Sequence, residues 1–334
     1  MQNIEKKPLG VIDALSSGFA LVVRHPWIVL LPIAFNLFLW LGPQINAKPL
    51  FDQMIVWLTA SASAAAPNLM PETQQGLDAS KEMLRAMGEN LNILNLVAVF
   101  ALGVPSLLGL ETLPSDTPRA PWFVVGDPGT LIVATALFAL IGIFIGSIYL
   151  ETIARVVRRE KGLQTFPPRV LKAYLNTGLL VGIGFLVVLI FLSPFLIGAT
   201  LISLLSQGLA SFVLIAGLML VLWAALYLAF ALPAVFVTGS NAVQAIWNSI
   251  TVFRYNFWSA MGLIFLIYLI QMGFSLVWQE LLANPWTAVF NVIANAFLGS
   301  GLIAAAMLFY FDRFTWLDEV RQRIRQQQRP LIKG

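Results

Sequence analysis

The chain has 334 residues and a formal net charge of +4, with 59% hydrophobic and only 11% charged residues. A soluble domain carries about 25% charged residues, and a mean hydropathy of +0.83 indicates that lipid faces much of this chain. The absence of cysteine excludes disulfides, thiol catalysis and thiolate metal sites, and a single histidine, His25, excludes a histidine-based metal cluster within one chain.

The N-terminal segment predicts a helix that lies in the membrane interface. In residues 9–25, apolar side chains recur at helical spacing opposite polar ones. Amphipathic helices of this kind lie in the headgroup plane before the chain turns into lipid. We therefore assign residues 1–26 to a cytoplasmic interfacial helix and the apolar residues 27–42 to a first, short span.

Residues 43–127 predict a helical cap outside the membrane. Apolar periodicity indicates helices in residues 50–65 and 71–92, and closely spaced prolines make 113–128 an extended loop. The segment 93–110 is apolar, but both of its flanks are acidic, which is typical of the outer side of a membrane. We interpret it as an interfacial or re-entrant segment rather than as a crossing.

Residues 128–311 predict a bundle of five further spans, followed by a basic cytoplasmic tail, 312–334. The apolar stretches that are long enough to cross cover residues 129–150, 178–205, 212–237, 260–277 and 286–311. With six spans, sixteen of the 20 Lys and Arg residues fall on one side of the membrane. The positive-inside rule then places both termini in the cytoplasm. The predicted fold is all-α, with about six transmembrane helices.

A second amphipathic segment, 243–258, precedes the fifth span and is similar in sequence to the first. Each runs through an arginine into a tryptophan, Arg24 and Trp27 in the first segment, Arg254 and Trp258 in the second. Two explanations stay open: an internal duplication, or convergence on an interfacial helix with an aromatic anchor.

Polar residues within the predicted spans are all uncharged. Ionisable side chains in lipid are costly and mark ion or substrate paths, so their absence argues against a proton-coupled transporter. Four amides do fall in the spans: Asn36, Gln271, Asn291 and Asn295. They either bond helix to helix, at about 0.6–2 kcal/mol each, or line a small polar cavity.

A basic cluster follows the second span. Its members are Arg155, Arg158, Arg159, Lys161, Arg169 and Lys172. The cluster either binds anionic lipid headgroups, at about 1 kcal/mol per basic residue near the surface, or acts only as a topology signal. Because no nucleic-acid-binding module accompanies these charges, we expect no nucleic-acid partner.

The sequence motifs of catalysis are missing. The chain has no P-loop, no GxSxG, no HExxH and no paired carboxylates within a span. We therefore expect a non-enzymatic protein without catalytic residues, cofactor or metal.

The pattern Ala245-Ile-x-x-Ser249-x-x-x-x-Arg254-x-x-x-Trp258, which stands before a span, resembles a group of bacterial membrane proteins. The group includes the membrane domain associated with glycerophosphoryl diester phosphodiesterases and several uncharacterised six-helix families. The similarity covers about the last third of the chain, with an echo at residues 14–27. The phosphodiesterase catalytic domain has no counterpart here. The resemblance implies a multi-pass protein of a bacterial plasma membrane and carries over no activity.

Taken together, these features favour a lipid-interacting protein, or a scaffold or assembly subunit of a larger membrane complex. The alternative is a permease or facilitator component for an apolar or amphipathic solute. The expected partners are membrane lipids and other membrane-protein subunits, and the sequence leaves the oligomeric state open.

Overall fold

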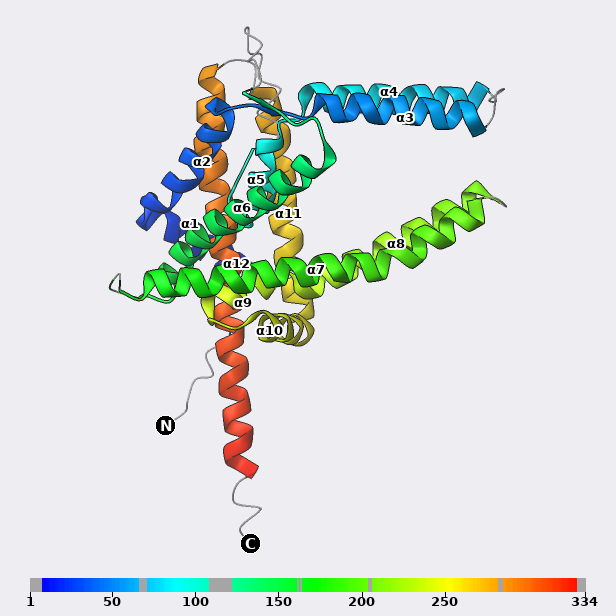
Figure 1. Cartoon of the computed structure of the whole chain (residues 1–334). Helices are drawn as coiled ribbons and strands as arrows, with labels where there is room; N and C mark the ends of the chain where they lie inside the picture. Colours follow the sequence, from blue (N-terminus) through cyan, green and yellow to red (C-terminus); the bar gives the residue numbers. More distant parts are fainter. Residues whose placement is uncertain are drawn as a thin grey trace. The chain divides into compact units, whose positions relative to one another are not determined.

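The computed structural model describes residues 8–65, 71–107, 122–160, 162, 164–203, 206–281 and 285–328. Over these residues the chain is mostly helical, with two short strands, which confirms the predicted all-α class (Figure 1). Among the described helices, five are long and apolar enough to cross a membrane. A sixth is added if Val11–Arg24 and Pro26–Leu41, bent by 92° at the break between them, form one span.

The chain divides into two compact units, each built from separated stretches of sequence. Unit 1 comprises Met1–Val29, Ser147–Val277 and Phe297–Gly334, and unit 2 comprises Leu30–Gly146 and Trp278–Ala296.

Unit 1 contains two short amphipathic helices and the larger share of the long apolar ones. Its elements are α1 (Val11–Arg24), η1 (Pro26–Val29), the end of α6 (Pro128–Val157), α7 (Phe166–Ser203), α8 (Gln207–Leu228), α9 (Ala231–Val237), α10 (Ala242–Tyr255), most of α11 (Phe257–Leu281) and the larger part of α12 (Pro285–Gln328). α7 and α8 pack against each other as a hairpin, and α8 begins where the Ser206 side chain caps the Leu209 N–H.

α1 and α10 have the same length, 14 residues, and the same end geometry. Each follows a cap residue in extended conformation, Gly10 (φ −66°, ψ 164°) and Asn241 (φ −72°, ψ 166°). Each ends at a residue that leaves the helix, His25 (φ −132°) and Asn256 (φ −126°), before the chain enters the next helix. The likeness of the two segments thus extends to the backbone, and it fits duplication and convergence equally.

α1 is fixed to α12 at two places within unit 1. A Cβ atom on Gly18 would lie 2.5 Å from the Gly301 carbonyl oxygen, so only glycine permits this approach of the helices. Near the start of α1, the Leu9 N–H donates to Asp312 Oδ2 at 2.7 Å, and the Leu9 carbonyl accepts from Arg313 Nη2 at 2.9 Å.

The predicted fourth span is broken between α8 and α9, one turn before Pro233. Proline has no N–H, so the carbonyl four residues earlier, on Ala229, loses its helical partner. Buried Ser249 of α10 hydrogen-bonds backbone groups at this break. Its hydroxyl accepts from the Phe230 N–H at 3.0 Å and donates to the Tyr227 carbonyl at 2.7 Å. Ser249, one of the residues that carry the sequence resemblance, therefore has a packing role.

Unit 2 contains α2 (Leu30–Leu41) and the elements that follow it. They are β1 (Ile45–Asn46), α3 (Lys48–Ala65), α4 (Pro71–Asn90), η2 (Ile93–Asn95), α5 (Leu96–Phe100), β2 (Phe123–Val124), most of α6 and the first turns of α12. α3 and α4 lie side by side as a hairpin (Figure 1), where helices were predicted for residues 50–65 and 71–92. β1 pairs in parallel with β2. The position of this region outside the membrane stays a prediction.

The segment predicted to be interfacial or re-entrant, 93–110, is described as far as residue 107. Its longest helix, α5, has five residues and rises only about 8 Å, so no helix in this part is long enough to span a bilayer core of about 30 Å. It packs closely on α6, because a Cβ atom on Gly142 would lie 2.5 Å from the Val97 carbonyl oxygen. Its interfacial or re-entrant position stays a prediction.

The long helices extend beyond the predicted spans. α6 continues seven residues past 150, α7 begins at Phe166 rather than at residue 178, and α12 continues past 311. Glu151 therefore lies inside α6, where it is 2% exposed. The prediction of uncharged spans covers residues 129–150 here, and the helix that contains this span continues into an ionisable residue, because the predicted span ends at the first charge.

Candidate functional site

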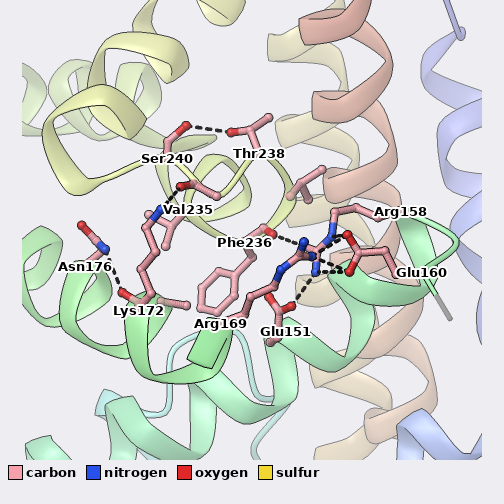
Figure 2. Close-up of a pocket in the computed structure, with 13 residues that line it drawn as sticks. Glu151, Arg158, Glu160, Arg169, Lys172, Asn176, Val235, Phe236, Thr238 and Ser240 are labelled. Atoms are coloured by element: carbon pink, nitrogen blue, oxygen red, sulfur yellow. Dashed lines mark hydrogen bonds and ion pairs between the residues drawn. The ribbon is translucent and has the colours of Figure 1, made fainter. Parts of the chain in front are cut away.

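A cavity of about 280 Å³ lies in unit 1, where α6 ends, α7 begins and the chain turns from α9 to α10 (Figure 2). The uncharged part of its wall consists of Ala173, Asn176 and residues 235–240. The charged side chains of the wall are Glu151, Arg158, Glu160, Arg169 and Lys172. Three cations and two carboxylates thus meet at the ends of apolar helices.

The turn between α6 and α7 positions these charges. Arg159 at φ 56° and Gly162 at φ 97° have left-handed backbone conformations, which reverse the chain within a few residues. Arg155, in the last turn of α6, donates to the Gly162 carbonyl and lies 5.8 Å from the centre of the Phe166 ring. One arginine of the predicted cluster therefore closes the turn itself.

Arg158 is the central residue of the charge network. It bonds Glu151 through Nη2 at 2.5 Å and Glu160 through Nε at 3.1 Å, and its Nη1 donates to the carbonyl of Phe236. That carbonyl lies in the last turn of α9, where helical donors are lacking and the helix dipole favours a cation. The side chains of Arg158 and Glu151 are only 11% and 3% exposed, so both charges need their partners.

Glu160 bridges the two arginines of the pocket. The Nη1 group of Arg169 donates to both oxygens of its carboxylate, and Arg158 binds the same carboxylate (Figure 2). The hydrogen bond from Arg169 is the main cause that lowers the pKa of the Glu160 carboxyl group, so this side chain is ionised at neutral pH. Unlike Glu151, Glu160 is 28% exposed and Arg169 is 43% exposed.

Lys172 and Asn176 connect α7 to the turn before α10. The ammonium of Lys172 donates to the Gly239 carbonyl at 2.9 Å, and the Asn176 side-chain oxygen accepts from the Ala242 N–H at 2.9 Å. Gly239 takes φ +66°, a conformation that favours glycine. Lys172 forms no ion pair with a carboxylate in the described part of the chain.

The predicted basic cluster is therefore not one uniform patch. Arg158 and Arg169 are paired with carboxylates, whereas Arg155, Arg159 and Lys172 form no ion pair with a described residue. Lys161 lies outside the described residues. Glu151 and Glu160 were not predicted as partners of these arginines, although a carboxylate seven residues before an arginine, as Glu151 is before Arg158, stands on the same face of a helix.

Asn36, predicted as an intramembrane amide, is fully engaged in packing within unit 2. Its side-chain NH₂ donates to the carbonyls of Pro32 and Pro105, each at 2.7 Å, and its oxygen accepts from the Leu107 N–H at 2.8 Å. The bonds to Pro105 and Leu107 join α2 to the irregular segment after α5. Asn36 leaves no polar atom for a solute.

The other three predicted amides differ from Asn36. Asn291 donates to the Trp278 carbonyl at 3.1 Å, but its side-chain oxygen has no hydrogen-bond partner within the described chain. The same holds for the side-chain nitrogen of Asn295, and both residues are buried in the first turns of α12. Gln271 is exposed on α11.

No group of three or more His, Asp or Glu residues in the described ranges is placed to hold a metal ion. Comparison with known proteins finds no matching family model, no matching curated protein and no matching solved structure. The similarity to the phosphodiesterase membrane domain therefore stays a prediction from sequence.

Proposed function

We propose that this chain is a non-enzymatic, lipid-interacting membrane protein whose pocket in unit 1 binds an anionic lipid headgroup. The observation that carries the proposal is the start of α7. Arg169 and Lys172 face the pocket there, and exposed Leu171, Leu175 and Leu179 follow at helical spacing on the same helix. Charge and apolar surface side by side suit a molecule with a phosphate head and acyl chains.

The size of the pocket supports a headgroup rather than a whole lipid. Sites for drug-sized ligands occupy about 300–1,000 Å³, and this cavity has about 280 Å³. A phosphate with its glycerol fits such a volume, whereas acyl chains do not. The chains would lie along the exposed leucines of α7.

The amphipathic helix α10 supports an interfacial position for the pocket. One face of α10 is buried through Ala245, Ser249 and Val252, whereas Trp247 and Tyr255 are exposed. Exposed aromatic residues next to apolar helices anchor at the level of the headgroups. The turn from α9 to α10 forms part of the pocket wall, so a headgroup bound there would lie at this depth.

The same proposal includes a location and an orientation: a bacterial plasma membrane, with both termini in the cytoplasm. It is supported by the basic residues around the pocket and in the tail. Since the chain has no cysteine, single cysteines report topology directly. A membrane-impermeant maleimide should label Ser80→Cys, on exposed α4, in intact cells. It should label Gln322→Cys, on α12, only after permeabilisation, and the opposite pattern would refute the orientation.

The direct test of the proposal compares two arginines. In neutral detergent, the full chain should bind anionic phospholipid about fivefold more weakly after Arg169→Gln, because one basic residue near a headgroup contributes about 1 kcal/mol. The matched control is Arg321→Gln, which removes the same charge from an exposed position on α12 and should change affinity less than about twofold. Equal effects of the two substitutions would argue for an unspecific charge effect.

A second candidate, a permease component for an amphipathic solute, is favoured by one observation. Asn291 and Asn295 in unit 2 have buried polar atoms without partners among the described residues, as expected where a small polar path is only partly occupied. Flux of a short-chain fluorescent phospholipid through reconstituted vesicles tests it. Flux that falls after Asn291→Ala but not after Gln271→Ala would favour the permease candidate over the headgroup site.

A further inference from the structure

The anion position of the pocket is already occupied. Glu160 places its carboxylate against the guanidinium groups of Arg158 and Arg169, with Arg169 bonded to both oxygens. A phosphate group presents oxygens to arginine in the same geometry as a carboxylate does. We propose that Glu160 acts as an internal competitor, which an anionic phosphate headgroup must displace from Arg169 in order to bind. This inference rests on the proposed headgroup site.

Arg158 and Arg169 depend on Glu160 to different degrees. Arg158 also bonds the buried carboxylate of Glu151 and the carbonyl of Phe236, so its charge stays compensated when Glu160 leaves. Arg169 has no second carboxylate partner in the described chain. Displacement of Glu160 therefore frees one specific cation, Arg169, while the buried pair of Arg158 and Glu151 keeps the helix ends in place.

The contact between Glu160 and Arg169 is of the kind that opens at little cost. Both side chains are partly exposed, 28% and 43%, and ion pairs open to solvent contribute about 0–1 kcal/mol. Glu160 stands in the turn between α6 and α7 rather than within a helix. Its carboxylate can therefore move away from Arg169 without unwinding either helix. An external phosphate then replaces an ion pair that itself contributes little stability.

The charge left behind selects the ligand. Once Glu160 has moved away, the pocket wall contains Arg158, Arg169 and Lys172 against the single carboxylate of Glu151. This excess of positive charge favours an anionic phosphate ester over a zwitterionic one. The ligand class is therefore a phosphate-bearing group with net negative charge, either the headgroup of an anionic phospholipid or a soluble phosphate ester.

Glu160→Gln tests the inference, because it removes the competing charge but keeps the shape of the side chain. The full chain in neutral detergent is titrated with short-chain phosphatidylglycerol, with phosphatidylcholine and with glycerol phosphate. Freeing one arginine should tighten the binding of phosphatidylglycerol about fivefold and leave phosphatidylcholine nearly unchanged. Glu319→Gln removes an exposed carboxylate from α12 and should change affinity less than about twofold.

The arms of the experiment separate the two sources of the phosphate. A gain with phosphatidylglycerol alone assigns the site to lipid, because acyl chains on the α7 leucines are then required. An equal gain with glycerol phosphate also supports displacement, but assigns the site to a soluble phosphate ester. In the double variant Glu160→Gln with Arg169→Gln, the gain should disappear, since the freed arginine is absent.

Failure of this inference differs from failure of the proposed function. If the wild-type chain binds anionic lipid through Arg169 but Glu160→Gln binds no more tightly, the competitor role of Glu160 is refuted and the site stands. If neither form binds any of the three probes, the headgroup site itself is refuted. The thermal unfolding midpoint of each variant shows that its fold is intact.

Discussion

The pocket of unit 1 and the surroundings of Asn36 in unit 2 show two ways in which polar groups are accommodated in an apolar helical protein. Around Asn36, every side-chain hydrogen-bonding group meets a backbone partner, at 2.7–2.8 Å. Around Arg158, charges compensate one another, and cations at the rim stay partly exposed. The amide fixes a fold, whereas the charged pocket leaves cations partly exposed, and these are the groups that the proposed function assigns to a ligand.

The difference follows from what each group requires when buried. A neutral amide needs only matching donors and acceptors, which irregular backbone near a proline provides. A buried charge needs an opposite charge and further hydrogen bonds. Arg158 has two carboxylates and a helix-end carbonyl as partners, whereas Arg169 is paired only with the Glu160 carboxylate, which stands in a turn.

The largest effect is expected at the buried end of this network. Glu151→Gln should destabilise the protein by about 3 kcal/mol, the lower end of the usual range for breaking a buried ion pair, because Glu160 still compensates Arg158. Thermal unfolding of the full chain in detergent measures the loss. An unchanged midpoint would mean that the pair of Arg158 and Glu151 contributes little.

A smaller effect is expected at Asn36. Asn36→Ala leaves the Leu107 N–H and the Pro105 carbonyl without their side-chain partner, which costs about 1–3 kcal/mol for a buried donor or acceptor. The same thermal measurement applies, and binding of anionic phospholipid should stay at the wild-type value. If the substitution instead lowered solute flux at unchanged stability, Asn36 would line a path rather than fix the fold.

The sequence predicted the helical class, the apolar helices and the amphipathic segment that became α10, because hydropathy and 3.6-residue periodicity are local signals. It also located the basic cluster. It could not show that Glu151 is buried, since a window of apolar residues ends at the first charge while the helix continues. The two further turns of α6 can be recognised only from the contacts that Arg158 makes with Glu151 and with α9. The contact with α9 is tertiary, so no local sequence pattern indicates it.

The predicted amides also show that sequence does not reveal tertiary packing partners. Asn36 finds partners 69 and 71 residues away, at Pro105 and Leu107, and no sequence pattern indicates that distance. Gln271 has the same chemistry but faces outward, because a helix that is apolar all round does not reveal which face is buried. Residue type predicted the candidates, and packing decided among them.

Retention of lipid by the native protein tests the central claim most directly. The full chain is extracted gently from its own membrane and examined by native mass spectrometry, alongside Arg169→Gln and the control Arg321→Gln. The headgroup site predicts one retained anionic phospholipid on the wild-type chain and on the control, and loss of that lipid from Arg169→Gln. A bare protein, or equal retention by all three forms, would contradict it.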